Sequence, residues 1–571
     1  MVGCSMRGSG DTTRPVVEGK TIFRSKGECM ATATAKPEVF TRKASGLVRV
    51  MSPFSAFVYN ILTMGLIFPW TYLWAPGALP GGKLVWGILL AMVIEIPIAL
   101  VYVWLSTALP RSGGDYVFQS RVFGGGVAFT VVMSGYVIWI LQWVALSGWL
   151  LAYLGFAPLF LGLGATTGSA ALSNIGLWFT GSTGIVITSI LNAFVAMMIL
   201  ISGFKNYVRF QSVMITGTLL AFVTMLVVLF LGNPATSMAS IDAFAMKIAG
   251  TPHFVQTAMD ASVAAGVDLK PQFSLLATLL VAPIAWTSLQ WATYSAQQNG
   301  EIKNARSFQS QMFIIVGSLI FTGIFLAILA AALEKAVGTE FLYVAGAGYW
   351  LGLEEALISG FYLWPNMIAV ALTASPWIVL LIGLGYILNS HQIVHNCYIG
   401  MTRVMVAMSL DRLLPEWVSK VDEKRHTPAN AHWAYFLASI PVILLYNLYP
   451  GWVGLTLGVT FACGYVFVIT CLAGALLPYR AKEVYEASPG AKYKIGNTPL
   501  VTVLGAIGFI LGGAMVLMFM FYSQLGLTST LAYVVVFGVL AFSAIWYFIA
   551  KNAQKSKGIN VDYAFKEIPP E

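Results

Sequence analysis

Twelve long apolar runs, separated by polar loops, constrain this chain more than any other feature of its sequence. Each run is long enough to cross a hydrocarbon core of about 30 Å as an α-helix that rises about 1.5 Å per residue. None alternates polar and apolar residues over about ten positions, as the strands of a membrane barrel do. The sequence therefore predicts an all-α polytopic membrane protein with twelve transmembrane helices. The predicted helices are 50–75, 84–109, 124–154, 183–203, 210–231, 273–295, 311–333, 371–395, 431–449, 452–477, 499–522 and 529–550.

Charged residues are scarce and unevenly placed. They make up 10% of the 571 residues, against about 25% in soluble domains. All 32 lysines and arginines fall in the two terminal segments or in loops on the same side of the predicted helices, except Lys83, Lys247, Lys270 and Lys335. Because basic residues concentrate in cytoplasmic loops, this bias predicts a multi-pass protein of the cell membrane with both termini cytoplasmic. The net charge of +9 follows from the same bias, so we expect the lipid bilayer, and no nucleic acid, as its partner.

Three segments are predicted along the chain. Residues 1–46 are polar and predict a disordered cytoplasmic leader without a cleavable signal peptide. Residues 47–550 hold the twelve helices, and residues 551–571 are expected to form a cytoplasmic tail. The five cysteines include no CxxC pair, which indicates neither a disulfide framework nor a metal site. His391 and His395 share a helix face, but no further ligand accompanies them, so we expect no metal and no cofactor.

Four loop motifs occur on one side of the predicted membrane. The sequence PRSGGDY (110–116) follows the second helix, and GEIKNA (300–305) follows the sixth. The sequences RVMVAMSLDRLLP (403–415) and TPANA (427–431) follow the eighth. With these motifs in this order among twelve helices, the chain resembles the amino acid permeases of the amino acid–polyamine–organocation superfamily of secondary transporters, over nearly all of its length between the two tails.

The resemblance implies a particular fold and a place for the substrate. It implies two inverted repeats of five helices, of the leucine-transporter type, over 47–232 and 273–477. Two further helices would follow within 499–550. It also implies that the first and sixth helices are broken near the middle of the bilayer and hold the substrate there.

The first predicted helix carries its own signal of a break. Pro69 has no N–H to bond the carbonyl of Gly65, and Gly65 adds backbone freedom at the same point. The alternative is a simple proline kink in a packed helix. Unpaired backbone groups at membrane depth need protein, water or ligand as partners, so Asn60, Thr63, Met64 and Gly65 are candidate substrate-binding residues. Thr63 stands where the family often has a glycine, which narrows access to the backbone and adds a hydroxyl.

The sixth and third predicted helices supply the other candidates. Their candidate substrate-binding residues are Trp286, Thr287, Ser288, Gln290 and Trp291 on the sixth helix, and Trp139 and Trp143 on the third. Trp291 falls where the family has an unwound glycine, which implies a smaller and more aromatic pocket. Polar side chains in membrane helices usually face the bundle interior, as ligands or as contacts between helices. The tryptophans could contact an ammonium group through their rings or could pack in the core.

Glu95 is the only acidic or basic residue within the twelve predicted helices. Insertion scales place the cost of such a residue at about 2.5–3.5 kcal/mol, so it is a functional candidate by default. We expect it to accept a coupling proton or to balance a cationic substrate. The alternative is a protonated glutamate that is hydrogen-bonded to a neighbouring helix.

These features together predict a secondary active transporter, a symporter or an exchanger, that moves amino acids by alternating access. Two alternatives remain open, which are a carrier of polyamines or other organic amines and a membrane sensor that has lost transport. Coupling to H⁺ or to Na⁺ is possible. We do not expect an enzyme, because the sequence has no P-loop and no catalytic serine or HExxH motif.

Overall fold

The computed structural model describes residues 45–66, 70–449, 452, 456–526 and 529–567. Within these residues, eleven helical stretches are long and apolar enough to cross a membrane. They correspond to the second through twelfth predicted helices. The first predicted helix, 50–75, is two shorter helices instead, α1 (Pro53–Met64) and α2 (Trp70–Ala78). The predicted all-α polytopic fold is therefore confirmed, whereas nearly all of the predicted leader, and Pro69, lie outside the described residues.

The remaining elements follow in chain order. The helices within the stretches that can cross a membrane are α3 (Leu84–Ala108), α5 (Gly125–Val132), α6 (Ile140–Leu150), α7 (Ala157–Thr167), α9 (Ser182–Ile201), α10 (Phe204–Leu231), α13 (Leu275–Leu289), α15 (Ser318–Trp350), α17 (Pro376–Leu410), α18 (Ala429–Leu448), α20 (Thr456–Arg480), α22 (Leu500–Phe521) and α23 (Thr530–Lys555). The helices outside these stretches, or at their ends, are α4 (Gly114–Phe123), α8 (Ala170–Trp178), α11 (Pro234–Ala249), α12 (Phe254–Ala264), α14 (Phe308–Gln311), α16 (Pro365–Ala371) and α21 (Lys482–Glu486).

Other turns interrupt or extend these helices. The π-helical turns are η1 (Met133–Ile138), η2 (Leu151–Phe156) and η5 (Met312–Gly317), and the 3₁₀ turns are η3 (Gln290–Gln297), η4 (Asn299–Glu301), η6 (Glu354–Ala356), η7 (Glu416–Ser419), η8 (Pro489–Lys492), η9 (Ser523–Leu525) and η10 (Val561–Lys566). The described residues contain one antiparallel pair of two-residue strands, β1 (Lys494–Ile495) and β2 (Thr498–Pro499).

Several helices are longer than their apolar runs. The third continues to Thr167, the seventh runs from Phe308 to Trp350, and the eighth ends at Leu410. Hydropathy marks the part of a helix that needs an apolar surrounding, whereas the backbone hydrogen bonds continue wherever no residue stops them. The seventh helix bends at Gly338, where φ is 78°, a conformation that suits glycine because it has no side chain.

Helices at corresponding positions of the two halves contact each other. The α1/α2 pair contacts α13 and η3, α3 contacts α15, α6 contacts α17, and α9 contacts α18. These are the first through fourth helices of one half, each against its counterpart in the other. Such pairing agrees with a two-fold relation between the two halves and with the leucine-transporter type of fold. The limits 47–232 and 273–477 for the repeats stay predictions.

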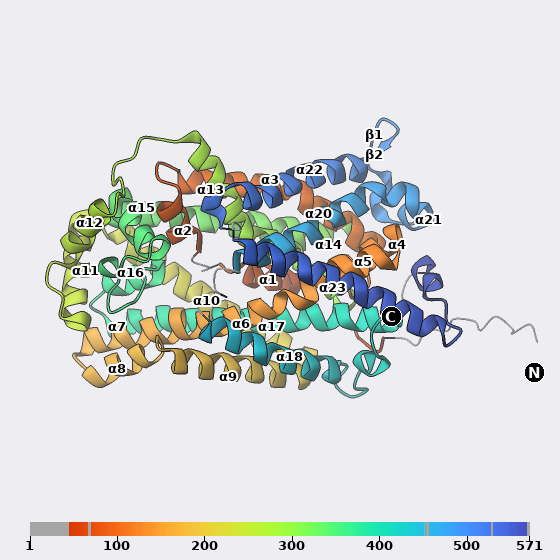
Figure 1. The fold of residues 1–571 in the computed structure, drawn as a ribbon, viewed down its shortest axis with the longest axis horizontal. Helices are drawn as coiled ribbons and strands as arrows, with labels where there is room; N and C mark the ends of the chain where they lie inside the picture. The colour runs from red at the N-terminus through yellow and green to blue at the C-terminus, as the bar shows by residue number, and fades with distance from the viewer. Residues whose placement is uncertain (1–44, 67–69, 450–451, 453–455, 527–528, 568–571) are drawn as a thin grey trace, which may run out of the picture. The chain divides into compact units, whose positions relative to one another are not determined.

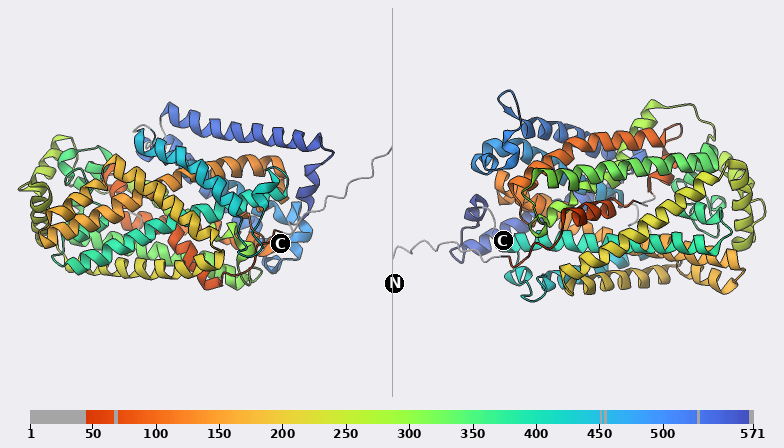
Figure 2. Two further views of the ribbon diagram at one scale, coloured as in Figure 1. Left: turned by 90° about the horizontal axis from the view of Figure 1, so that it is seen from below. Right: turned by 180° about the vertical axis from the view of Figure 1, so that it is seen from behind.

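The last two helices lie outside this paired core. α22 packs on α20 and α3, and α23 packs on α5; Figure 2 shows α23 along the outside of the bundle. The bundle has two ends that are used below. The α4 end carries α4, η7 and η10, and the α11 end carries α11, α12 and η6, opposite to it in Figure 1. The distribution of basic residues predicts that the α4 end is cytoplasmic.

Candidate functional site

The break in the first helix begins where the sequence predicted it. α1 ends at Met64, and Gly65 follows in the left-handed region with φ 74° and ψ 84°. The Gly65 N–H still reaches the Ile61 carbonyl at 3.1 Å, and α2 starts only at Trp70. The glycine thus closes the helix, and the carbonyls of its last turn lose their usual partners.

The sixth helix changes type instead of opening. α13 ends at Leu289, and the chain continues directly as the 3₁₀ helix η3. The tighter winding keeps backbone hydrogen bonds in place through Trp291. The unwound segment that the resemblance implied here is therefore a change of helical pitch, of the kind that often marks a hinge.

A cavity lies between these two irregular points. Its volume is about 30 Å³, and its described lining is Thr63, Met64, Ile140, Trp143, Thr287, Ser288, Trp291, Tyr294, Ile393, Asn396 and Cys397. None of these side chains is charged. A space of this size holds about one or two water molecules, so a larger organic molecule would need a wider cavity.

Hydroxyl and amide groups join three helices at the cavity. The Ser288 hydroxyl donates to the carbonyl of Met64, which the end of α1 has freed. The Asn396 amide on α17 donates to the Thr63 hydroxyl at 2.7 Å, and that hydroxyl donates to the Tyr59 carbonyl at 2.6 Å. The threonine in place of a glycine thus links α1 to α17.

Aromatic rings form another part of the wall. Trp291 meets Trp143 edge to face, with ring centroids 5.9 Å apart, and meets Tyr294 at 5.3 Å. The Trp291 indole N–H donates to the Thr287 carbonyl at 2.9 Å, which fixes its ring against its own helix. The prediction of an aromatic pocket around Trp291 agrees with this geometry.

Six of the eleven predicted substrate-binding residues line the cavity. They are Thr63, Met64, Trp143, Thr287, Ser288 and Trp291. The other five, Asn60, Gly65, Trp139, Trp286 and Gln290, are buried nearby but do not line it. A role in substrate binding stays a prediction for all of them.

Asn60 is one of the predicted residues outside the lining, and its polar groups are all used between helices. Its amide donates to the Ser295 hydroxyl and to the Ile314 carbonyl, each at 3.1 Å, and its carbonyl accepts from the Ser295 N–H at 2.9 Å. These bonds tie α1 to η3 and η5. Its polar groups are therefore used between helices and do not face the cavity.

The sequence reasoning missed five lining residues, which are Ile140, Tyr294, Ile393, Asn396 and Cys397. Asn396 gave a signal, because an amide within an apolar stretch usually faces the interior, but the predicted eighth helix stopped one residue before it. Ile140 and Ile393 gave none, because an isoleucine that faces a cavity and one that faces a neighbouring helix look alike in sequence.

Glu95 lies behind the cavity on α3, fully buried. One carboxyl oxygen, Oε2, accepts a hydrogen bond of 2.6 Å from the Trp286 indole N–H. The other, Oε1, has no hydrogen-bond partner in the part of the chain that the structure describes. Trp286 directly precedes the lining residues Thr287 and Ser288, so its side chain connects Glu95 to the wall of the cavity.

Aromatic side chains pack together on the side of the cavity that faces the α11 end. Trp70, at the start of α2, stacks on Trp149 at 6.2 Å and meets Trp364 edge to face at 5.6 Å. Tyr153 stacks on Phe361 at 4.4 Å, and its hydroxyl donates to the Gly360 carbonyl at 2.7 Å. We call these rings the aromatic layer.

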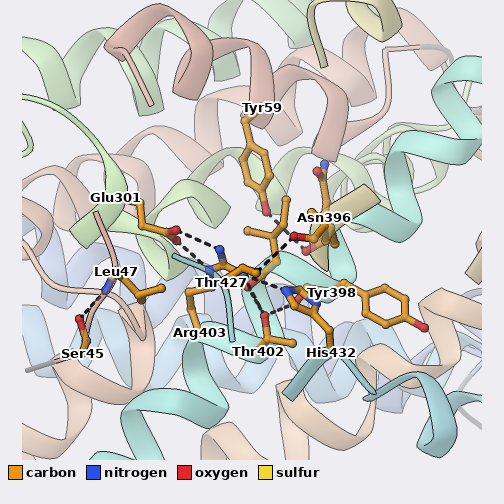
Figure 3. A network of polar contacts seen from close by, with 12 residues as sticks. Ser45, Leu47, Tyr59, Glu301, Asn396, Tyr398, Thr402, Arg403, Thr427 and His432 are labelled. Carbon is orange, nitrogen blue, oxygen red and sulfur yellow. Dashed lines mark hydrogen bonds and ion pairs between the residues drawn. The ribbon is translucent and has the colours of Figure 1, made fainter. Parts of the chain in front are cut away.

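A buried ion pair joins Glu301 of η4 to Arg403 of α17 (Figure 3), and on α17 it lies between the cavity and the α4 end. Arg403 donates to both carboxyl oxygens of Glu301, at 2.7 Å and 2.9 Å, and both side chains are 1% exposed. The same guanidinium donates to the Thr402 hydroxyl at 3.1 Å and lies 3.3 Å from His432 Nε2. Glu301 comes from GEIKNA and Arg403 from RVMVAMSLDRLLP, so two of the loop motifs meet here.

No group of three or more His, Cys, Asp or Glu side chains within the described ranges is arranged to hold a metal ion. The described lining of the cavity offers hydroxyl, amide, carbonyl and aromatic groups. The expectation of no cofactor stays a prediction.

Comparison with known proteins bears on what the site is for. A sequence model of the amino acid permease family matches residues 52–542. A local similarity also exists to uncharacterized protein 399 of Sulfolobus islandicus rod-shaped virus 1, with 32% identity over 102 residues. That stretch covers 16% of this chain and 26% of the viral protein, so only the family match bears on function.

Proposed function

Because the chain belongs to the amino acid permease family, we propose that it carries small neutral amino acids across the cell membrane by alternating access, as a symporter or an exchanger. Membership makes it a membrane transporter of amino acids or related organic substrates, and points away from an enzyme. The finer statement rests on one observation, the uncharged cavity at the end of α1.

The groups around the break suit the two ends of an amino acid. Carbonyls freed at the C-terminus of α1 carry partial negative charge and favour an ammonium group. The N-terminus of α2, on the other side of the break, favours a carboxylate. The rings of Trp143, Trp291 and Tyr294 add an apolar wall for a small side chain.

A polyamine fits this cavity less well. It carries two or more ammonium groups, and each needs a carboxylate or several oxygens when it leaves water. The described lining has no acidic side chain, and Glu95 is hydrogen-bonded to Trp286 behind the wall. We therefore favour amino acids over the amine alternative.

The two closures around the cavity support alternating access. Such a carrier exposes its site to one side at a time, so each side needs a closure that can open separately. The aromatic layer can serve this purpose toward the α11 end, and the Glu301–Arg403 pair toward the α4 end. The alternative of a sensor without transport requires no such pair of closures.

Counterflow in proteoliposomes tests the proposal. Vesicles loaded with an unlabelled neutral amino acid should accumulate the labelled form, whereas vesicles loaded with a polyamine should not accumulate labelled polyamine. A thermal-shift screen identifies the amino acid to use, because a ligand that binds the folded state raises its stability. Binding without counterflow would favour the sensor, and counterflow of polyamines alone would refute the substrate class.

A matched pair of variants places the site. Ser288→Ala removes the hydroxyl that bonds the Met64 carbonyl, and we expect counterflow to fall about tenfold, which corresponds to about 1.4 kcal/mol, near the upper end for one neutral hydrogen bond. Ser212→Ala removes a hydroxyl from the exposed face of α10 and should leave transport unchanged. Equal effects of the two substitutions would mean that the cavity is not the binding site.

A second proposal concerns coupling, for which we favour H⁺ over Na⁺. An ionised carboxylate with a single neutral donor is costly in a protein core, so a proton on Glu95 stabilises the state described here. Glu95→Gln should keep counterflow, which needs no net proton movement, and should lose uptake driven by a pH gradient. Unchanged uptake with unchanged pH dependence would refute this role, and a requirement for Na⁺ would favour the other ion.

A further inference from the structure

Four acidic side chains are buried in the described part of the chain, and they fall into two kinds. Glu301 pairs with Arg403, and Asp411 pairs with Arg121 at 3.0 Å. The other two, Glu95 and Asp115, form no ion pair with any described basic side chain. Arginine stabilises the charge of the first two acids, so a different explanation is needed for the other two.

Asp115 lies at the α4 end, in the first turn of α4, and is fully buried. One carboxyl oxygen accepts from the hydroxyls of Tyr102 on α3 and Thr470 on α20. The other accepts from the Gln297 amide at the end of η3. Burial raises the pKa of the Asp115 carboxyl above its ordinary value of 3.8, although these three hydrogen bonds act in the opposite direction.

The same surroundings can also accommodate a protonated Asp115 carboxyl without a change in the backbone. The Gln297 carbonyl oxygen, Oε1, is buried and has no partner among the described residues. If its amide rotates by half a turn, Oε1 faces the Asp115 oxygen that Nε2 now contacts. A protonated Asp115 would then donate to that oxygen while still accepting from Tyr102 and Thr470. Both charge states of Asp115 therefore have a complete set of partners.

Other titratable groups lie near the two acids. Tyr102 lies seven residues after Glu95, which is about two turns along the same face of α3. Cys471, next to Thr470 on α20, lies within electrostatic range of both Glu95 and Asp115. Tyr136 of η1 also lies within electrostatic range of Asp115, whereas Arg121 on α4 pairs with Asp411.

Asp115 also contacts the end of η3, the element that carries part of the cavity wall. Gln297 ends η3, whose first turns carry the cavity residues Trp291 and Tyr294. The backbone carbonyl of Gln297 accepts a hydrogen bond from the Gly113 N–H at 2.7 Å, so this end of η3 is tied to the loop before α4. The charge of Asp115 therefore affects a contact that continues to the cavity wall.

We propose that Asp115 is a second proton-binding carboxyl, nearer the α4 end, and that the coupling proton of Glu95 enters or leaves through it. In each step a proton passes from one carboxyl to the other through intervening hydroxyl groups or water, and no other bond forms or breaks. This inference rests on the proposed proton-coupled transport and adds the route toward the α4 end.

The variant Asp115→Asn tests the inference, because an asparagine keeps the shape of a neutral carboxyl but cannot release a proton. Its amide can donate to Gln297 Oε1 in the rotated arrangement, so the fold should be retained. In proteoliposomes we expect counterflow of a neutral amino acid to stay within about twofold of the unsubstituted chain, while accumulation driven by a pH gradient falls about tenfold or more, because the proton cannot leave. A pH-sensitive dye inside the vesicles should report the same loss of proton movement.

Two further variants serve as check and control. Tyr102→Phe removes one donor to Asp115, which should shift the pH midpoint of uptake upward by up to about one unit. This readout remains if Asp115→Asn does not fold. Asp422→Asn changes an exposed aspartate on the loop after α17, and should leave the pH profile unchanged.

The outcomes separate the two proposals. If the unsubstituted chain shows no counterflow, the proposed transport function falls, and this inference falls with it. If it shows proton-driven uptake that Asp115→Asn retains, or a midpoint that Tyr102→Phe does not move, the inference is wrong and the transport function stands.

Discussion

The buried ion pair between Glu301 and Arg403 is expected to stabilise the closed α4 end. Arg403→Met removes two hydrogen bonds to the Glu301 carboxylate, one to Thr402 and one to His432. It also removes a guanidinium that lies 5.0 Å from the centre of the Phe204 ring. Because Glu301 would keep a charge in the core without its partner, we expect a loss of about 3–5 kcal/mol in the free energy of unfolding.

A double-mutant cycle measures the pair itself. Glu301→Gln combined with Arg403→Met leaves no unpaired charge, so the double variant should recover about 1–3 kcal/mol relative to the sum of the single losses. The assay is reversible denaturation of the purified protein in detergent, with the free energy extrapolated to zero denaturant. Transport should be measured on the same samples, since a weakened closure at the α4 end also predicts poorer coupling.

An exposed pair of the same chain supplies the control. Lys482 and Glu486 lie 3.7 Å apart, with side chains 70% and 61% exposed, so Lys482→Met should cost less than about 1 kcal/mol. A loss for Arg403→Met that is no larger than this control would refute the reasoning that burial makes the Glu301–Arg403 pair indispensable.

Three other predictions follow from local geometry. Gly65→Ala should lower the free energy of unfolding by about 1–2 kcal/mol, because φ is 74° there. Gly513→Ala on α22, with open space around it, should be neutral or slightly stabilising, and equal shifts in melting temperature for the two variants would contradict this. Asn60→Ala should cost about 1–3 kcal/mol in a denaturation assay, because it leaves the Ser295 groups unpaired; a change below about 0.5 kcal/mol would argue against its role between helices. Burial raises the pKa of Asp115, so the folded state binds a proton on this carboxyl more tightly than the unfolded state does. The stability from this proton is therefore lost as pH rises from about 3.8 through the higher folded pKa. Asp115→Asn should remove that part of the pH dependence, and identical pH–stability curves for the two proteins would show that Asp115 does not contribute.

The transmembrane helices were predictable because the physics behind them is local. A helix that crosses lipid needs a continuous apolar run, and all twelve runs correspond to helices or, over 50–75, to a broken pair. The end of α1 was predictable for the same reason, since Gly65 acts on its own backbone. Helix ends beyond the bilayer were missed, because they lie in polar sequence where hydropathy carries no signal.

The cavity was only partly predictable, because its lining depends on how distant segments meet. Residues next to the irregular backbone, such as Thr63 and Ser288, were found from the resemblance and their polarity. Ile140 and Ile393 line the same space from α6 and α17, and nothing local marks them. The pairing of Glu95 with Trp286 is also a contact across the bundle, so the sequence could identify Glu95 as unusual but could not identify its partner.

Cys397 allows the most direct test of the cavity as the transport site. It lines the cavity, whereas Cys463 is buried elsewhere, with its thiol on the Gly135 carbonyl. Two variants are compared, each keeping one of these two cysteines as the only cysteine of the chain. In proteoliposomes, a small thiol reagent should label Cys397 as the site opens, and the amino acid that drives counterflow should slow this labelling at the concentrations that saturate transport, while Cys463 should stay unlabelled. Transport of the amino acid with no effect on the labelling of Cys397 would contradict the account, because the substrate would then cross the protein without occupying this cavity.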